Sequence, residues 1–188
     1  MPMEADWEVE IGPGAPVIDA RWAGFVDLRQ TPEQALQLSE VASLPSLADV
    51  LVRLNGVESP IWTSKCDLWP VVDPAEFHPD EMDASAENAT HAWACYTDLL
   101  SRNGEQWNDP ALAVEWCRSI CKRLHGVSLT HCRADLIVRQ ALISAANIGV
   151  GITAYLTACG PTAENANQVL QSALRTFTDA VCTSSTLE

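Results

Sequence analysis

The stretch from Leu129 to Cys159 constrains the fold most, because apolar and polar residues alternate along two successive runs. In the first run the apolar residues are spaced two apart, at Cys132, Ala134, Leu136 and Val138. The second run has the same spacing, at Val150, Ile152, Ala154, Leu156 and Ala158. A period of two with one apolar face is typical of a half-buried antiparallel strand. The stretch therefore predicts a β-hairpin that buries one face and leaves its charged face uncovered.

Three segments before the hairpin also have the pattern of strands, at residues 7–11, 17–28 and 60–72. Helical spacing predicts helices between Thr31 and Pro45 and at residues 46–55, 86–102, 110–124 and 161–182. Thr31-Pro32 and Asp109-Pro110 each combine an N-cap residue with a proline at the first helical position. Pro45 separates the first two helices, since a proline inside a helix removes a hydrogen bond and clashes with the preceding turn.

This order of elements predicts an α+β fold. We expect a mainly antiparallel sheet of four to five strands, with helices packed on one face and a polar open face on the other. Residues 1–186 are expected to form a single domain, with an acidic loop at residues 73–87 inside it. Leu187-Glu188 is interpreted as a cloning scar.

The net charge of −14 argues against nucleic acid and anionic membranes as partners. An acidic surface repels phosphate backbones and anionic lipids, so we expect neither nucleic acid nor a membrane as partner. No secretion signal is evident, so the seven cysteines predict a cytoplasmic protein with reduced, core-forming thiols. Cys117, Cys121 and His125 are spaced four apart but lack the paired motifs of a zinc site. We therefore expect no metal and no other cofactor.

Cations gather on the outward faces of the predicted strands. Five of the eleven Lys and Arg residues lie there: Arg21, Arg29, Lys65, Arg133 and Arg139. Acids share these faces, so one interpretation is a set of cross-strand ion pairs on a solvated surface. The other is a charged platform that binds a carboxylate or phosphate. For that platform we select as ligand-binding candidates Arg21, Lys65, Asp67, Arg133, Arg139 and Tyr155.

Two residues on the same face are candidates for catalysis. His131 would act as a general base, oriented by Asp135 or Asp67, and Asp135 is itself the second acid–base candidate. The chain has no P-loop, GxGxxG, GxSxG or HExxH motif, so nothing in the sequence decides whether the protein is an enzyme.

Two classes of function fit these observations. The favoured one is a soluble intracellular binding or interaction protein that uses the charged open face to hold a partner or ligand, with pairing to a second copy of the chain left open. The alternative is a small enzyme or binding protein that acts on an anionic carboxylate or phosphate metabolite. A flat patch with an apolar rim would favour the first class, and a concave pocket over the sheet would favour the second.

Overall fold

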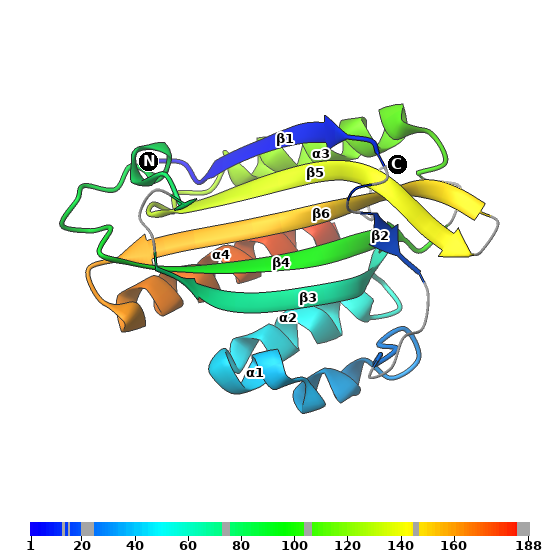
Figure 1. Ribbon diagram of the computed structural model, residues 1–188, viewed down its shortest axis with the longest axis horizontal. Coiled ribbons are helices and arrows are strands. Elements are labelled where there is room, and N and C mark those ends of the chain that lie inside the picture. The colour runs from blue at the N-terminus through cyan, green and yellow to red at the C-terminus, as the bar shows by residue number, and fades with distance from the viewer. Residues whose placement is uncertain are drawn as a thin grey trace.

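The computed structural model describes residues 1–12, 14, 16–19, 25–72, 76–103, 107–144 and 147–183. Its described residues form a six-stranded sheet (Figure 1), with strands β1 (Glu4–Glu10), β2 (Val17–Ile18), β3 (Ile61–Val71), β4 (His91–Ser101), β5 (Cys132–Ser144) and β6 (Asn147–Gly160). The helices are η1 (Pro32–Gln37), α1 (Ser39–Ser43), α2 (Ser46–Asn55), η3 (Pro79–Met82), α3 (Pro110–Leu124) and α4 (Ala163–Cys182). In these residues no helix is long and apolar enough to cross a bilayer.

The sheet has the strand order β1-β5-β6-β4-β3, and β2 also pairs with β5. The pairs β3–β4, β4–β6 and β5–β6 are antiparallel, as expected. β1 and β2 run parallel to β5, which makes the sheet mixed. The predicted α+β class is therefore confirmed, while the sheet has more strands than the expected four to five and is not purely antiparallel.

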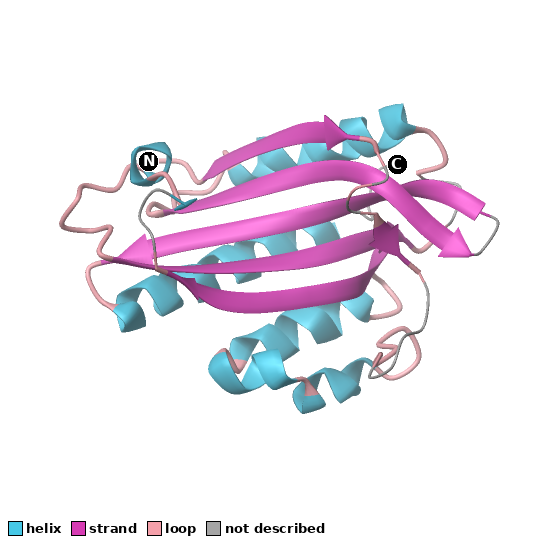
Figure 2. Ribbon diagram, viewed as in Figure 1, coloured by secondary structure: helices cyan, strands magenta, loops and turns pink. Residues whose placement is uncertain are grey.

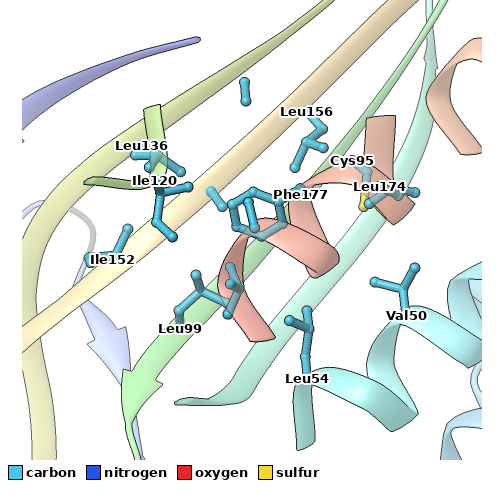
Figure 3. Close-up of a cluster of buried hydrophobic side chains, with 14 of the residues drawn as sticks. Val50, Leu54, Cys95, Leu99, Ile120, Leu136, Ile152, Leu156, Leu174 and Phe177 are labelled. Carbon is cyan, nitrogen blue, oxygen red and sulfur yellow. The ribbon is translucent and has the colours of Figure 1, made fainter. Parts of the chain in front are cut away.

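The predicted hairpin is present as β5 and β6, and its apolar residues face the helices. Figure 2 shows α3 and α4 behind the sheet, with the opposite face toward the viewer. In the core, Leu136, Ile152 and Leu156 of the hairpin join Ile120 of α3 and Phe177 of α4 (Figure 3). Helices therefore cover one face of the sheet, and the residues that alternate with this set lie on the other.

The prediction of a helix at residues 86–102 is wrong, because this segment contains the central strand β4. β4 lies between β3 and β6, and it is buried on both faces. A strand buried on both faces needs no polar alternation, so it reads as a nearly continuous apolar run. Such a run is compatible with a buried helix as well, which explains the error.

The prediction of a long strand at residues 17–28 is also wrong. Only Val17 and Ile18 are in a strand, residues 25–27 have no regular structure, and residues 20–24 lie outside the described part. Val26 and Leu28 nevertheless pack against the core. The alternation here comes from a loop that buries some of its apolar side chains.

The face opposite the helices is covered at its two ends. At one end the segment 76–90 brings Phe77 and Met82 onto Ala92 and Cys159. At the other end Val17 of β2 packs with Trp62, Leu100 and Ala141. A Cβ atom added to Gly151 would lie only 2.8 Å from the Cβ of Val17, so glycine is needed where β2 crosses β6. We call the region between these two end walls the open face.

Candidate ligand-binding cavity on the open face of the sheet

Between the two end walls the open face is hollow. A cavity of about 410 Å³ lies over the sheet, and five strands and the segment after β3 supply its lining: Asp6, Trp7, Glu8, Trp69, Val71, Glu76, Ala94, Arg133, Asp135, Leu136, Ile137, Tyr155 and Thr157. Small-molecule sites commonly have volumes of about 300–1,000 Å³. We call this space the open-face cavity.

Strand register aligns polar side chains across the open face, three of which line the cavity. Asp6 of β1 pairs with Asp135, Asp135 with Tyr155, Tyr155 with Tyr96, and Tyr96 with Asp67. Directly paired residues project to the same face of a sheet. These five side chains therefore form one row across β1, β5, β6, β4 and β3.

Three aromatic rings form a contiguous group on this face. The ring centroids of Tyr96 and Tyr155 are 5.8 Å apart, and those of Trp69 and Tyr96 are 6.1 Å apart. Burial raises the pKa of Tyr96 to about 12, so its phenol stays neutral at physiological pH. Tyr155 and Trp69 line the cavity, and Tyr96 contacts both rings.

The charged lining is mainly acidic. Its described residues carry four carboxyl groups, of Asp6, Glu8, Glu76 and Asp135, and one guanidinium, of Arg133. The Arg133 Nε donates to Asp135 Oδ1 at 2.7 Å, and its Nη1 forms an ion pair with Glu81 of η3. Burial raises the pKa of Asp135, although the Arg133 guanidinium opposes this effect.

The structure brings together only part of the predicted binding set. Arg133, Asp135 and Tyr155 line the open-face cavity, and Asp67 lies exposed at the end of the same row. Lys65 lines a smaller separate cavity beside Phe25 and Cys66. Arg21 lies outside the described residues.

The remaining cations of the predicted platform are held by neighbouring acids. Arg139 lies beyond the cavity and forms a 2.9 Å ion pair with Glu10 of β1. Arg29 binds Asp27 at 2.8 Å and Asp19 at 3.1 Å. Together with the Arg133 pairs, these contacts favour cross-strand and local ion pairing over a platform of available cations.

His131 is not near the acids that were expected to orient it. His131 precedes β5 and has a positive φ of 64°. Its backbone N–H donates to the Met82 carbonyl, and the residue lines a different depression together with Cys159 and Gly160. Asp135 is four positions along the same chain, about 13 Å away at the strand rise of about 3.3 Å per residue. The geometry gives no support to a His131–Asp135 catalytic pair.

Cys117 and Cys121 of α3 and His125 just after it have different surroundings. Cys117 and Cys121 are buried in the core, and the Nε2 of His125 lies 3.0 Å from the Ala5 carbonyl. Over the described ranges, no three His, Cys, Asp or Glu residues lie together as metal ligands would.

Sequence reasoning missed several residues in and beside the cavity. The wrong helix prediction concealed Ala94, which lines the cavity, and Tyr96, which contacts its rings, although an aromatic-containing apolar run is also typical of a central strand. Glu8 was correctly placed opposite the apolar face of β1, but no local pattern indicates that β1 lies beside β5. Asp6 was missed for the same reason.

One further acid of the open face, Asp98, is buried outside the cavity lining. Asp98 of β4 is 6 % exposed, and its Oδ1 accepts a hydrogen bond from Thr153 Oγ1 at 2.7 Å. Burial raises the pKa of Asp98. The open face therefore holds carboxyl groups both in the cavity and under its neighbouring surface.

Searches of protein-family models, of curated proteins and of solved structures each return no match. The chemistry of the open-face cavity is inferred from its own residues.

Proposed function

We propose that the protein is a non-enzymatic binding protein that holds a small ligand in the open-face cavity. The observation that supports this proposal is the cavity of about 410 Å³, which five strands and Glu76 line. A flat patch with an apolar rim would have favoured a protein interface, whereas a concave pocket with a few polar groups is typical of small-ligand sites.

An anionic metabolite, the alternative ligand, is less well supported. Arg133 is the one cation among the cavity-lining residues that the structure describes, and it already binds Asp135 and Glu81. An anion would have to displace these carboxylates and enter a lining that carries four carboxyl groups. A catalytic role is likewise unsupported, since His131 lies away from Asp135 and faces a different depression.

The test is a thermal-shift screen with a defined panel of compounds, each at millimolar concentration. The panel contains alkylammonium salts, guanidinium salts, carboxylates, sugar phosphates and uncharged aromatic compounds. At least one class should raise the Tm, because a ligand that binds only the native state stabilises it by mass action. Saturation at about 100 times Kd corresponds to about 2.7 kcal/mol, or several degrees for a chain of this size.

The Thr157→Phe variant locates the binding site, because the larger side chain projects into the open-face cavity from β6. We expect this variant to fold and to lose the ligand-induced shift. Ala42→Phe on the exposed surface of α1 is the matched control and should keep it. The proposal fails if no compound raises the Tm of the unaltered protein, or if both variants lose the shift to the same extent.

A further inference from the structure

We propose that the occupant of the open-face cavity is a small organic cation that carries an alkylated ammonium group. This inference rests on the proposed function, because it names the chemical class of ligand for the same cavity. Two independent features support it, an aromatic group on the floor and acidic residues along one wall.

The aromatic group offers ring surfaces to a cation. Tyr155 and Trp69 line the cavity, and Tyr96 contacts both, with centroid distances of 5.8 Å to Tyr155 and 6.1 Å to Trp69. Cations are attracted to the faces of tyrosine and tryptophan rings, and quaternary ammonium groups are recognised in this way. Tyr96 does not line the cavity itself, and its neutral phenol adds no charge beside the two lining rings.

The acidic wall supplies the charge that the floor lacks. Asp6 and Glu8 project from β1, which borders the cavity along β5, and Glu76 reaches it from the segment after β3. Arg133 is the one cation among the described residues of this lining, and its guanidinium is bound to Asp135 and Glu81, so the acids outnumber the cations there. The field in the cavity therefore favours a positively charged ligand.

An alkylated ammonium group fits this lining better than a primary ammonium or a guanidinium. Those two groups carry several N–H donors, each of which needs an acceptor after it leaves water. Besides its rings the floor has small or aliphatic side chains, Ala94 and Ile137, and one threonine, Thr157, while the Asp135 carboxylate is already bound to Arg133. An alkylated ammonium group has few or no N–H donors that need acceptors. It is attracted both to the ring faces and to the carboxylates of the acidic wall.

The dimensions of the cavity indicate a free small molecule. Its volume of about 410 Å³ suits a compound of small-ligand size. Choline is therefore a suitable probe, since it combines a quaternary ammonium with one hydroxyl group that an acidic side chain can accept from.

The first measurement compares choline with its uncharged isostere dimethylbutanol, in which carbon replaces the nitrogen. Both titrations use the unaltered protein and are followed by calorimetry and by tryptophan fluorescence. Choline should bind at least about tenfold more tightly than the isostere, because cation–π attraction to several rings adds to that of the acidic wall. Equal affinity for the two compounds would overturn the inference, and this comparison depends on no variant.

Variants then assign the attraction to particular groups. Tyr155→Leu should weaken choline binding by about tenfold, while Tyr155→Phe, which keeps the ring, should stay within about threefold. Glu8→Gln should weaken binding by about threefold at low salt and less at high salt. Glu33→Gln, an equal change of charge on the exposed surface of η1, should leave the affinity unchanged. Unchanged affinity in both Tyr155→Leu and Glu8→Gln would contradict the assignment.

Failure of this inference can be told apart from failure of the proposed function. If carboxylates, phosphates or neutral aromatics give a shift that Thr157→Phe abolishes while choline does not bind, the cavity binds ligands and only the cationic assignment is wrong. If the protein sediments with phosphatidylcholine vesicles but does not bind free choline, the assignment to a free small molecule is wrong.

Discussion

Asp98 is a carboxyl group placed where its charge is unfavourable. It is 6 % exposed, it accepts one hydrogen bond from Thr153, and burial raises its pKa above the ordinary value. Lys65 and Arg139 act in the opposite direction but do not outweigh the loss of water. The consequence is a cost to stability whenever Asp98 is ionised.

This cost predicts the pH dependence of an Asp98→Asn variant. Because the pKa is raised in the folded state, the folded protein binds more protons than the unfolded chain between the two pKa values, and stability falls as pH rises through that range. The variant keeps an oxygen acceptor for Thr153 and has no charge to bury. We expect its Tm at pH 7 to exceed that of the unaltered protein by about 2–4 °C, which corresponds to about 1 kcal/mol.

Thermal unfolding followed by circular dichroism from pH 4 to pH 8 checks this expectation. The gain should shrink toward the acidic end, where the carboxyl of the unaltered protein is protonated. Asp67→Asn, an exposed change on the same face, is the control and should show no such pH-dependent gain. A lower Tm for Asp98→Asn at pH 7 would show that the ionised carboxylate is stabilised by its neighbours.

Among the elements, α2 is tied to the edge strand β3 by one buried side chain. The Asn55 Nδ2 donates to the Leu51 carbonyl and to Thr63 Oγ1, each at 2.8 Å, and its Oδ1 accepts from the Thr63 N–H at 2.9 Å. Asn55 and Thr63 are both buried, so water cannot replace these hydrogen bonds without a change in packing. Asn55 therefore fixes the helix against the first residues of β3.

Asn55→Ala should destabilise the protein by about 2–3 kcal/mol, because it leaves the Thr63 N–H and hydroxyl buried without their partner. Urea denaturation measures the change in the free energy of unfolding. Asn167→Ala on α4 removes a 2.7 Å hydrogen bond from Gln171 at a partly exposed site and should change it by less than about 0.5 kcal/mol. Equal losses in the two variants would rule out a special role for Asn55.

The elements differ in how well local sequence predicts them. β5 alternates visibly because Cys132, Ala134 and Leu136 are buried while Arg133 and Asp135 are only partly so. β6, β3 and β1 alternate in residue type, although Thr153 of β6 is buried and Val9 of β1 is exposed. The N-caps of α3 and α4 are also local, since Asp109 accepts from Ala111 and Thr162 from Asn165. β4 gave no such signal because both its faces are buried, and β2 is only two residues long.

At the scale of the whole molecule, the open-face cavity could be predicted only in part. Arg133, Asp135 and Tyr155 were selected because they lie on the charged face of a clear hairpin. Tyr96 and Asp6 come from strands that are far from the hairpin in sequence, and only the register of the complete sheet places them in the same row. The ion pair between Arg133 and Glu81 also depends on a loop whose path local sequence does not specify.

The helix-covered core predicts how the thiols react. Cys117, Cys121 and Cys132 are buried and Cys66 is partly buried, and burial raises the pKa of all four thiols, to about 11 for Cys121 and about 12 for Cys132 and Cys66. The thiolate is the reactive form, so it is scarce in the folded state at pH 8. We expect these residues to react slowly with Ellman's reagent in native buffer and rapidly in denaturant.

Mass spectrometry after a short pulse of labelling identifies the residues that react. Cys182, which is half-buried at the end of α4, serves as an internal comparison and should be labelled before Cys117. Prompt native labelling of Cys117 and Cys132 would show that the core opens readily or is packed differently.

The position of β1 affects the order in which the molecule is assembled during synthesis. β1 leaves the ribosome long before β5, the strand with which it pairs in parallel. Until β5 is made, Asp6 and Glu8 have no sheet to join, and closing so long a loop is among the slower steps of folding. The nascent chain can pair β3 with β4 early, whereas the acidic wall of the cavity forms only after nearly every other strand exists. Binding of the proposed ligand is therefore expected only after the hairpin has been translated.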